Sequence, residues 1–250
     1  MKQSAPPRIL VVVPTYNEQT NLEALIGKIS ALGIPDLNMI VVDDNSPDGT
    51  GNIADALSKN YPLTVLHRER KQGLGTAYAE AFRYILGEPQ FASLRCVIHM
   101  DADFSHDPAV ISRMVEALGY SDAVIGSRYV RGGMVEAWSL PRRILSRGAN
   151  WYARTVLGLP YRDVTSGFRA YQIDTLRQLS AVSFSSIGYA FLVEVSYALH
   201  RLNRRVIEIP ITFVERRQGD SKMAFGIIAE SFWNVLRLRF RKKRIGARVI

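Results

Sequence analysis

The first half of the chain alternates short β-branched, apolar runs with stretches of helical periodicity, and this pattern restricts the possible folds more than any other feature. The runs that read as strands are 9–13, 39–42, 63–66, 96–100 and 123–125. The helical stretches between them are 21–32, 51–57, 76–86 and 109–118. Alternating strands and helices indicate a mostly parallel sheet with helices packed on its faces, so the sequence predicts an α/β fold.

The second half of the chain has a different pattern. A basic helix is predicted over 141–157, a loop or strand around 163–171, a helix over 190–202, a strand over 205–213 and a polar loop over 215–222. A last helix, 224–240, carries apolar residues at spacings of three and four and is followed by four cations at 241–244. An apolar face with a cationic end suits a membrane interface.

The composition is that of a globular protein with a basic bias. Of the 250 residues 47% are hydrophobic, and 32 Lys and Arg against 23 Asp and Glu give a net charge of +9. Nucleic acid, an anionic membrane surface and phosphorylated small molecules are the candidate partners. Cys96 is the only cysteine, which excludes an intrachain disulfide, and no signal-peptide pattern is present, so we expect a cytoplasmic setting. The apolar runs are far shorter than the about 20 residues of a spanning helix.

Polar clusters follow four of the five predicted strands. They occupy positions 14–18, 43–49, 101–103 and 126–129. In open α/β sheets, ligands bind beyond the carboxyl ends of the strands. We therefore expect these four segments to converge on one site.

Asp101 and Asp103 are the candidate metal ligands. They are two residues apart, so if the strand continues through them both carboxylates project to one face. Mg²⁺ favours one or two carboxylates together with waters and diphosphate oxygens. The alternative is a solvated turn of the kind that Asp favours.

A second acidic pair, Asp43 and Asp44, can recognise ribose hydroxyls or base edges. Turn chemistry and helix capping are enough to explain Ser46 and Asp48 nearby. They do not explain Asp43 and Asp44, because adjacent carboxylates repel each other unless something offsets their charge.

Three basic groups lie elsewhere along the chain. Arg68, Arg70 and Lys71 precede a glycine loop at 73–76, which is either a phosphate-binding loop or a plain tight turn. The polar loop 215–222 either closes over a diphosphate, with Arg216 and Lys222 as its cations, or is a solvated surface loop.

The third basic group mixes cations with apolar residues. Its cations are Arg128, Arg142, Arg143 and Arg147, and its apolar members are Trp138, Leu140, Ile144, Leu145 and Trp151. It is either a solvated face or a site for a phosphate-anchored lipid beside an apolar groove. Its aliphatic character argues against a base-stacking platform for nucleic acid.

The motifs at 14–18, 43–50, 73–78, 101–103, 126–129, 146–150 and 219–222, in this order along one chain, resemble those of a known family. It is the polyprenol-phosphate (dolichol-phosphate) mannose synthases, inverting family-2 glycosyltransferases of GT-A fold. The resemblance covers about residues 9–222. It implies a GT-A domain over 1–222 that includes the acceptor-side helix 141–157. Residues 223–250 then form an amphipathic helix and basic tail of the same structural unit.

The resemblance also implies a role for each matching residue. The nucleotide-sugar set is Pro14, Tyr16, Glu18, Asp44, Ala102, Arg128, Arg216 and Lys222. The acceptor-phosphate set is Arg128, Arg142, Ser146 and Arg147. The catalytic set is Asp101, Asp103 and Arg216. Mg²⁺ or Mn²⁺ is implied at Asp101 and Asp103, with Ser105 as a further ligand at a position where some relatives carry Gln.

The implied reaction transfers mannose from GDP-mannose to a polyprenyl phosphate with inversion. The protein would lie on the cytoplasmic face of a membrane, alone or with an anchoring partner, and would bind no nucleic acid. Three alternatives are a UDP-glucose-dependent polyprenyl-phosphate glucosyltransferase, a transferase that acts on a polysaccharide hydroxyl, and a non-catalytic protein that binds nucleotide, nucleic acid or membrane.

Overall fold

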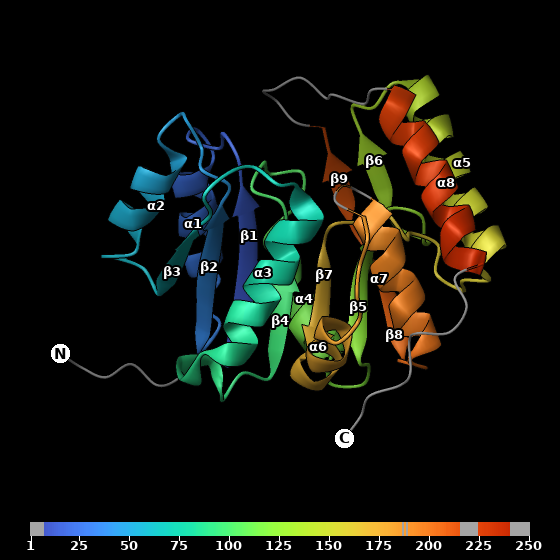
Figure 1. Cartoon of the computed structure of the whole chain (residues 1–250). Helices are drawn as coiled ribbons and strands as arrows, with labels where there is room; N and C mark the ends of the chain where they lie inside the picture. Colours follow the sequence, from blue (N-terminus) through green and yellow to red (C-terminus); the bar gives the residue numbers. More distant parts are fainter. Residues whose placement is uncertain (1–7, 187, 189, 216–224, 241–250) are drawn as a thin grey trace.

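The computed structural model describes residues 8–186, 188, 190–215 and 225–240, and its centre is a seven-stranded sheet (Figure 1). In spatial order the strands are β3 (Leu63–His67), β2 (Leu37–Asp43), β1 (Ile9–Thr15), β4 (Cys96–His99), β7 (Arg169–Gln172), β5 (Ala123–Ser127) and β8 (Val206–Pro210). Strand β7 runs antiparallel to both of its neighbours, and the other pairs in this sheet are parallel. The predicted α/β fold with a mostly parallel sheet is therefore confirmed.

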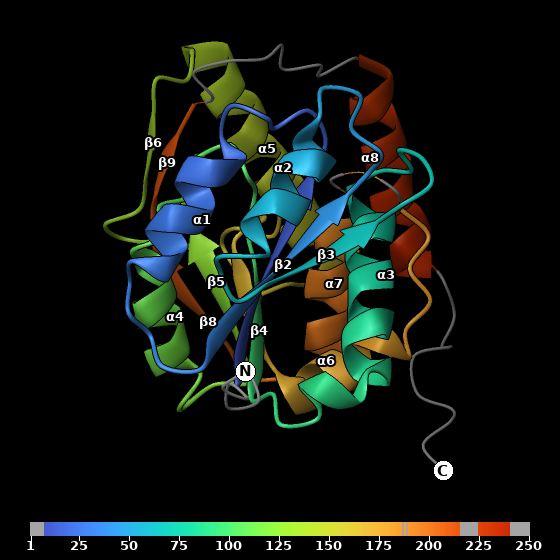
Figure 2. The same ribbon diagram turned by 90° about the vertical axis from the view of Figure 1, so that its left-hand side faces the viewer.

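Helices cover both faces of the sheet (Figure 2). On one side lie α1 (Leu22–Ser30), α2 (Thr50–Leu57) and α4 (Val110–Ala117), and on the other α3 (Leu74–Gly87), α6 (Ile173–Ser180) and α7 (Ala190–Arg201). Val11 and Val13 belong to the first core, whereas Leu10 and Val12 belong to the second. Burial of both faces explains why β1 is a continuous apolar run.

The predicted strand over 205–213 is wrong as a single element. It divides into β8, in the main sheet, and β9 (Thr212–Val214), which pairs in parallel with β6 (Met134–Glu136). Pro210 stands at the break, and because proline has no N–H group it cannot donate to a continuing ladder. Strands β6 and β9 follow the carboxyl ends of β5 and β8, at the end of the main sheet where the polar segments lie.

Helix α8 (Phe225–Phe240) packs along α5 (Leu140–Leu157) (Figure 1). The rings of Tyr152 and Phe232 stack with centroids 4.4 Å apart, and Val235 and Leu238 join a third core cluster with Leu157. In the part of the chain that the structure describes, every helix is too short or too polar to cross a membrane.

Buried His99 makes the stability of the fold depend on pH. The imidazole is fully buried, and its Nε2 lies 2.8 Å from the hydroxyl oxygen of Tyr171. Burial, with a smaller contribution from Arg169, lowers the pKa of His99 well below its usual value. Since the unfolded histidine takes up a proton near pH 6.5, the unfolded chain binds more protons below that pH, and stability falls as pH decreases by up to about 1.4 kcal/mol per pH unit.

We expect the thermal midpoint to drop between neutral pH and about pH 5, and the His99→Gln variant to show a shallower drop. Thermal unfolding followed by circular dichroism at several pH values measures both slopes. Equal slopes in the two proteins would contradict a neutral buried His99.

Candidate active site

The four polar segments lie at the same edge of the sheet, as the sequence predicts. Strands β1 and β2 end side by side, with Thr15 opposite Asp43, and Val12 pairs with His99 of β4. Three residues that follow these strands have left-handed backbones, with φ of 60° at Asn17, 55° at Asn45 and 59° at Phe104. Asparagine tolerates this conformation, whereas an aromatic residue adopts it only where its surroundings enforce it.

Hydrogen bonds explain how Asp43 is accommodated at this edge. Its carboxylate accepts hydrogen bonds from the Thr15 hydroxyl (3.0 Å), the Ser46 amide (3.0 Å) and the Ser46 hydroxyl (2.6 Å). Asp48 fixes the start of α2 in a similar way, by accepting from the amide and hydroxyl of Thr50. Burial alone would raise the pKa of Asp48, but hydrogen bonds from Thr50 and Gln19 hold that pKa below its usual value.

The negative charge of Asp44 is offset by Arg68. Its carboxylate forms a buried ion pair with Arg68, whose guanidinium also donates to Glu80 (2.8 Å) and Thr76 (2.9 Å). Arg68 is therefore a structural partner of Asp44 and α3. A Cβ atom at Gly75 would lie 2.7 Å from the Ser186 carbonyl oxygen, so this glycine permits close packing at the start of α3.

The other nucleotide-side candidates lie at the end of β1. Pro14 and Tyr16 are half-buried, and the Lys71 ammonium lies 3.7 Å from the centroid of the Tyr16 ring. Glu18 is buried, accepts a hydrogen bond from the Asn21 side chain (2.8 Å), and offers its carbonyl to the amides that begin α1. The structure thus brings these residues to strand ends next to Asp44.

Asp101 and Asp103 do not share a strand face, contrary to the expectation from their spacing, because β4 ends at His99. They lie instead in a turn. Asp103 Oδ1 accepts the Ser105 amide (3.0 Å), and the Asp101 amide donates to His106 Nδ1 (3.2 Å). A Cβ atom at Gly167 would lie 3.3 Å from Asp101 Oδ2, so a side chain larger than glycine there would crowd this carboxylate.

The residues of this turn fit a hard divalent cation. No cluster of three or more Asp, Glu, His or Cys able to hold a metal occurs among the described residues. Two carboxylates are nevertheless sufficient for a cation that takes its remaining ligands from water and a diphosphate. Ala102 between them is buried, and the Ser105 hydroxyl is buried without a hydrogen-bond partner in the described part of the chain. That oxygen stays available as a further donor.

His106 supports this turn as a neutral group. Its ring stacks on Phe168 with centroids 5.0 Å apart, and it is almost fully buried. Burial lowers the pKa of His106 to about 4, although the nearby Asp103 opposes the shift. The uncharged imidazole accepts a hydrogen bond from the Asp101 amide and so positions the turn. Because it carries no positive charge, it does not compete with a metal cation for the two carboxylates.

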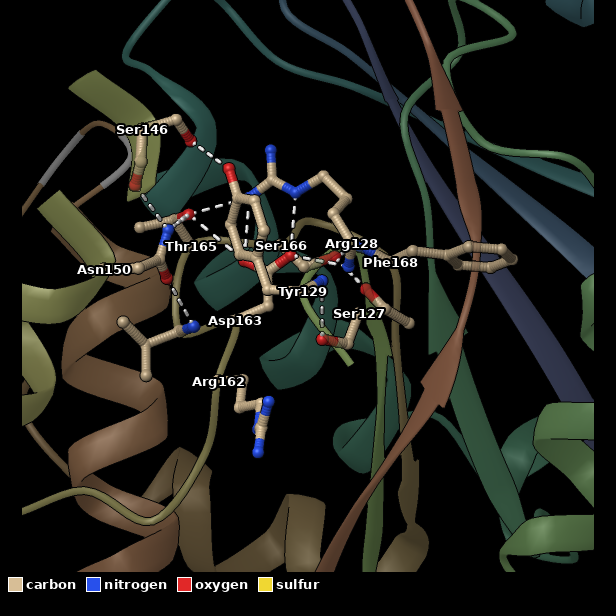
Figure 3. Close-up of polar contacts among 12 residues, drawn as sticks. Ser127, Arg128, Tyr129, Ser146, Asn150, Arg162, Asp163, Thr165, Ser166 and Phe168 are labelled. Atoms are coloured by element: carbon tan, nitrogen blue, oxygen red, sulfur yellow. Dashed lines mark hydrogen bonds and ion pairs between the residues drawn. The ribbon is translucent and has the colours of Figure 1, made fainter. Parts of the chain in front are cut away.

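Arg128 is held in a buried ion pair that the sequence analysis missed (Figure 3). Its Nε and Nη2 donate to the two carboxylate oxygens of Asp163, each at 2.7 Å, and Nη2 also donates to Thr165 (2.8 Å). Burial opposes both charges, but their attraction dominates, so the pKa of Arg128 is raised and that of Asp163 is lowered. Thr165 in turn accepts from Asn150 of α5 (2.9 Å).

The remaining acceptor-side candidates lie on α5. The Tyr129 hydroxyl donates to Ser146 Oγ (2.7 Å), and Arg147 is exposed with its guanidinium carbon 5.9 Å from the centroid of the Tyr129 ring. Arg142 pairs with Glu215 and lies 4.3 Å from the centroid of the Trp138 ring. Arg216 and Lys222 lie outside the described residues. The structure therefore groups Ser146 and Arg147 with Tyr129, and places Arg142 beside the end of β9.

Two partners were not identified from the sequence, Asp163 and Glu215. The polar run at 163–166, between a helix and a strand, was the available signal for the first. Glu215 directly precedes Arg216 in the predicted polar loop 215–222. Neither sequence position reveals which arginine it would meet.

Comparison with known proteins places this chain in a family. Residues 10–180 match the family model described as glycosyl transferase family 2. The chain is 43% identical over 92% of its length to the undecaprenyl-phosphate mannosyltransferase of Micrococcus luteus, 93% of which is covered. It is 40% identical over 91% of its length to the polyprenol monophosphomannose synthase of Mycolicibacterium smegmatis, 85% of which is covered.

Solved structures agree on the fold. A glucosyl-3-phosphoglycerate synthase from Mycobacterium tuberculosis, in complex with Mn²⁺, UDP and phosphoglyceric acid, superposes with a TM-score of 0.69 at 20% identity. The similarity covers 93% of this chain and 78% of the synthase. Together with the family match and the relatives, this fold shows that the chain belongs to the family-2 glycosyltransferases and has their GT-A-like architecture.

Proposed function

We propose that the protein transfers mannose from GDP-mannose to a polyprenyl phosphate with inversion at the anomeric carbon. The names of its relatives support this acceptor and this sugar. The observation that carries the proposal is the placement of two kinds of group at one sheet edge. A carboxylate turn at Asp101 and Asp103 suits the donor diphosphate, and arginines on and beside α5 suit an acceptor phosphate.

Asp101 and Asp103, with Ser105 as a further oxygen donor, are the residues that would hold Mg²⁺ or Mn²⁺. The cation would neutralise the diphosphate leaving group. The Asp103 carboxylate is oriented by the Ser105 amide, and the Asp101 backbone by His106. These contacts preorganise the turn before the donor arrives, which limits the reorganisation needed during the reaction.

The nucleoside would lie across the ends of β1 and β2. Pro14 and Tyr16 provide half-buried surfaces, and Asp44 and Glu18 provide carboxylates at the same edge. Ala102 lines the approach of the diphosphate to the turn. Arg216 and Lys222 complete this set as cations for the diphosphate, from the segment that follows β9.

The acceptor side needs no strong general base. The attacking oxygen belongs to a phosphate that is already anionic near neutral pH, so the protein's task is to hold and align it. Ser146, Arg142 and Arg147 would bind this phosphate. Arg128 is fixed by Asp163 through Nε and Nη2, and this pairing would hold its guanidinium in a set orientation between the two substrates, so that it need not move during the reaction.

A lipid-linked acceptor requires contact with a membrane surface. Several large apolar side chains of α5 and α8 are exposed, namely Leu140, Ile144, Leu145, Trp151, Phe232, Trp233 and Phe240. Amphipathic helices of this kind lie in the plane of the interface. We place the protein peripherally on a membrane, by itself or with an anchoring partner.

A transfer assay tests the proposal. The purified chain with Mg²⁺ and a polyprenyl phosphate is given radiolabelled GDP-mannose or UDP-glucose in parallel, and label is counted in the organic phase. Mannose-selective transfer is the expected result. Glucose-selective transfer would overturn the donor, and no transfer from either donor would overturn the proposed reaction.

The Arg142–Glu215 pair predicts an effect on acceptor binding. Both side chains are partly exposed, and such a pair contributes about 1 kcal/mol or less. The Glu215→Gln variant releases Arg142 for the acceptor phosphate, so KM for the acceptor should fall by up to about fivefold with little change in kcat. Glu136→Gln, which neutralises an exposed carboxylate on β6, is the matched control. An unchanged or increased KM for Glu215→Gln would show that the pair does not compete with the acceptor.

A further inference from the structure

A pocket of about 300 Å³ opens between α5 and the segment 128–133. Arg147, Trp151 and Arg154 line it from successive turns of α5, and Tyr129 and Arg162 line it from the facing segments. Tyr152 and Val156, on another side of the helix, pack toward the third core cluster, which includes α8 residues. The pocket therefore lies on a flank of α5 that α8 does not cover.

The pocket carries positive charge that the described residues leave unbalanced. Arg128, at its inner end, is neutralised by Asp163. Among the described residues, Arg147, Arg154 and Arg162 form no ion pair, and no carboxylate lines the cavity. The carboxylate of Glu208 is occupied by the backbone amides of Arg162 and Asp163. Three guanidinium groups around a small cavity match a phosphate, which accepts several charge-assisted hydrogen bonds at once.

The rim of the pocket indicates a lipid as the source of that phosphate. Trp151 is 67% exposed at the pocket, and Ile144 and Leu140, 63% and 70% exposed, continue the same outward face of α5. An amphipathic tryptophan beside arginines with long apolar stems is the arrangement found at the level of lipid headgroups. A ligand with an anionic head and apolar chains satisfies both surfaces.

One end of the pocket borders the proposed acceptor site at Arg147, and the other end, at Arg154 and Arg162, lies outside that site. Arg154 lies twelve residues after Arg142 on one helix, which puts their Cα atoms about 18 Å apart at 1.5 Å per residue. Arg142 is moreover held by Glu215 and lies against Trp138, and neither of these residues lines the pocket.

We propose that the end of this arginine pocket at Arg154 and Arg162 binds the phosphate of an anionic membrane phospholipid, next to Arg147, which the pocket shares with the proposed acceptor site. The site holds α5 at the headgroup level while the acceptor phosphate occupies the catalytic edge. It is independent of which sugar and which acceptor the enzyme uses.

The test compares two double variants that lose the same charge. Arg154→Gln with Arg162→Gln alters the pocket, and Arg83→Gln with Arg201→Gln removes two exposed arginines from α3 and α7. Binding is measured by co-sedimentation with vesicles of phosphatidylcholine, with and without phosphatidylglycerol. Each arginine at an anionic surface contributes about 1 kcal/mol, so the pocket variant should bind the anionic vesicles at least about tenfold more weakly than the control variant. Equal losses in the two variants would reduce the effect to overall charge and overturn the proposal.

Two further measurements separate the alternatives. Calorimetric titration of the unmodified protein should show tighter binding of a short-chain phosphatidylglycerol than of inorganic phosphate, and equal binding would overturn the lipid assignment. Turnover with a soluble short-chain polyprenyl phosphate, without vesicles, should be unchanged in the pocket variant. A loss of that turnover would assign the pocket to the acceptor, which overturns the separate site and leaves the proposed reaction standing. Thermal unfolding of both variants verifies that each is folded.

Discussion

The Asp103→Asn variant is expected to lose nearly all transfer activity while it keeps its fold. The amide oxygen can still accept the Ser105 hydrogen bond, so the turn is preserved. The negative charge that a divalent cation needs is lost, however. Removing one such electrostatic contribution typically lowers kcat by about a hundredfold to a thousandfold. Initial rates at saturating donor and acceptor measure the effect.

Asp107→Asn is the matched control for this experiment. Asp107 belongs to the same connection after β4, is exposed, and accepts the amide of Ala109. Its variant should retain nearly the full rate. If Asp103→Asn also kept its activity, the metal assignment of the 101–105 turn would be wrong.

The Asp163→Asn variant is expected to cause the largest loss of stability. Asp163 is fully buried and takes two hydrogen bonds from the Arg128 side chain and one from its amide. Removing the carboxylate leaves a buried cation without its partner, which costs about 3–5 kcal/mol. Denaturant unfolding of the two proteins gives the difference in the free energy of unfolding.

A double variant distinguishes the cost of the unpaired Arg128 charge from the other effects of replacing Asp163. Arg128→Met with Asp163→Asn removes the unpaired charge and should recover part of the stability lost in Asp163→Asn. It should not recover transfer activity, because Arg128 is proposed to act between the two substrates. A free energy of unfolding that Asp163→Asn leaves unchanged would contradict the buried ion pair.

The parts of the fold that depend on local pattern could be predicted from the sequence. Buried parallel strands read as continuous apolar runs, so β1 to β5 could be recognised. Because parallel strands end at the same edge, the convergence of the polar segments followed without any knowledge of pairing partners. The short strand β6 and the helix α6 were missed.

The parts that depend on contacts between distant residues could not be predicted. Arg128 and Asp163 are 35 positions apart, and Asp44 and Arg68 are 24 apart. Sequence spacing does not specify such partners. Three arginines that the sequence offers as phosphate ligands therefore differ in burial and in ion pairing. Arg68 is buried with Asp44, Arg128 is buried with Asp163, and Arg147 is exposed. Tertiary folding alone decides which cations meet a carboxylate.

The anomeric configuration of the product tests the central claim most directly. If an acceptor phosphate oxygen displaces GDP in a single step at this site, the α-linked mannose of the donor must become β-linked to phosphate. Proton and phosphorus NMR of the purified lipid product, made by the unmodified protein, determine both the linkage and the configuration. The account predicts a β-mannosyl phosphate. An α-linked product, or mannose attached through a carbon-bound hydroxyl, would contradict it.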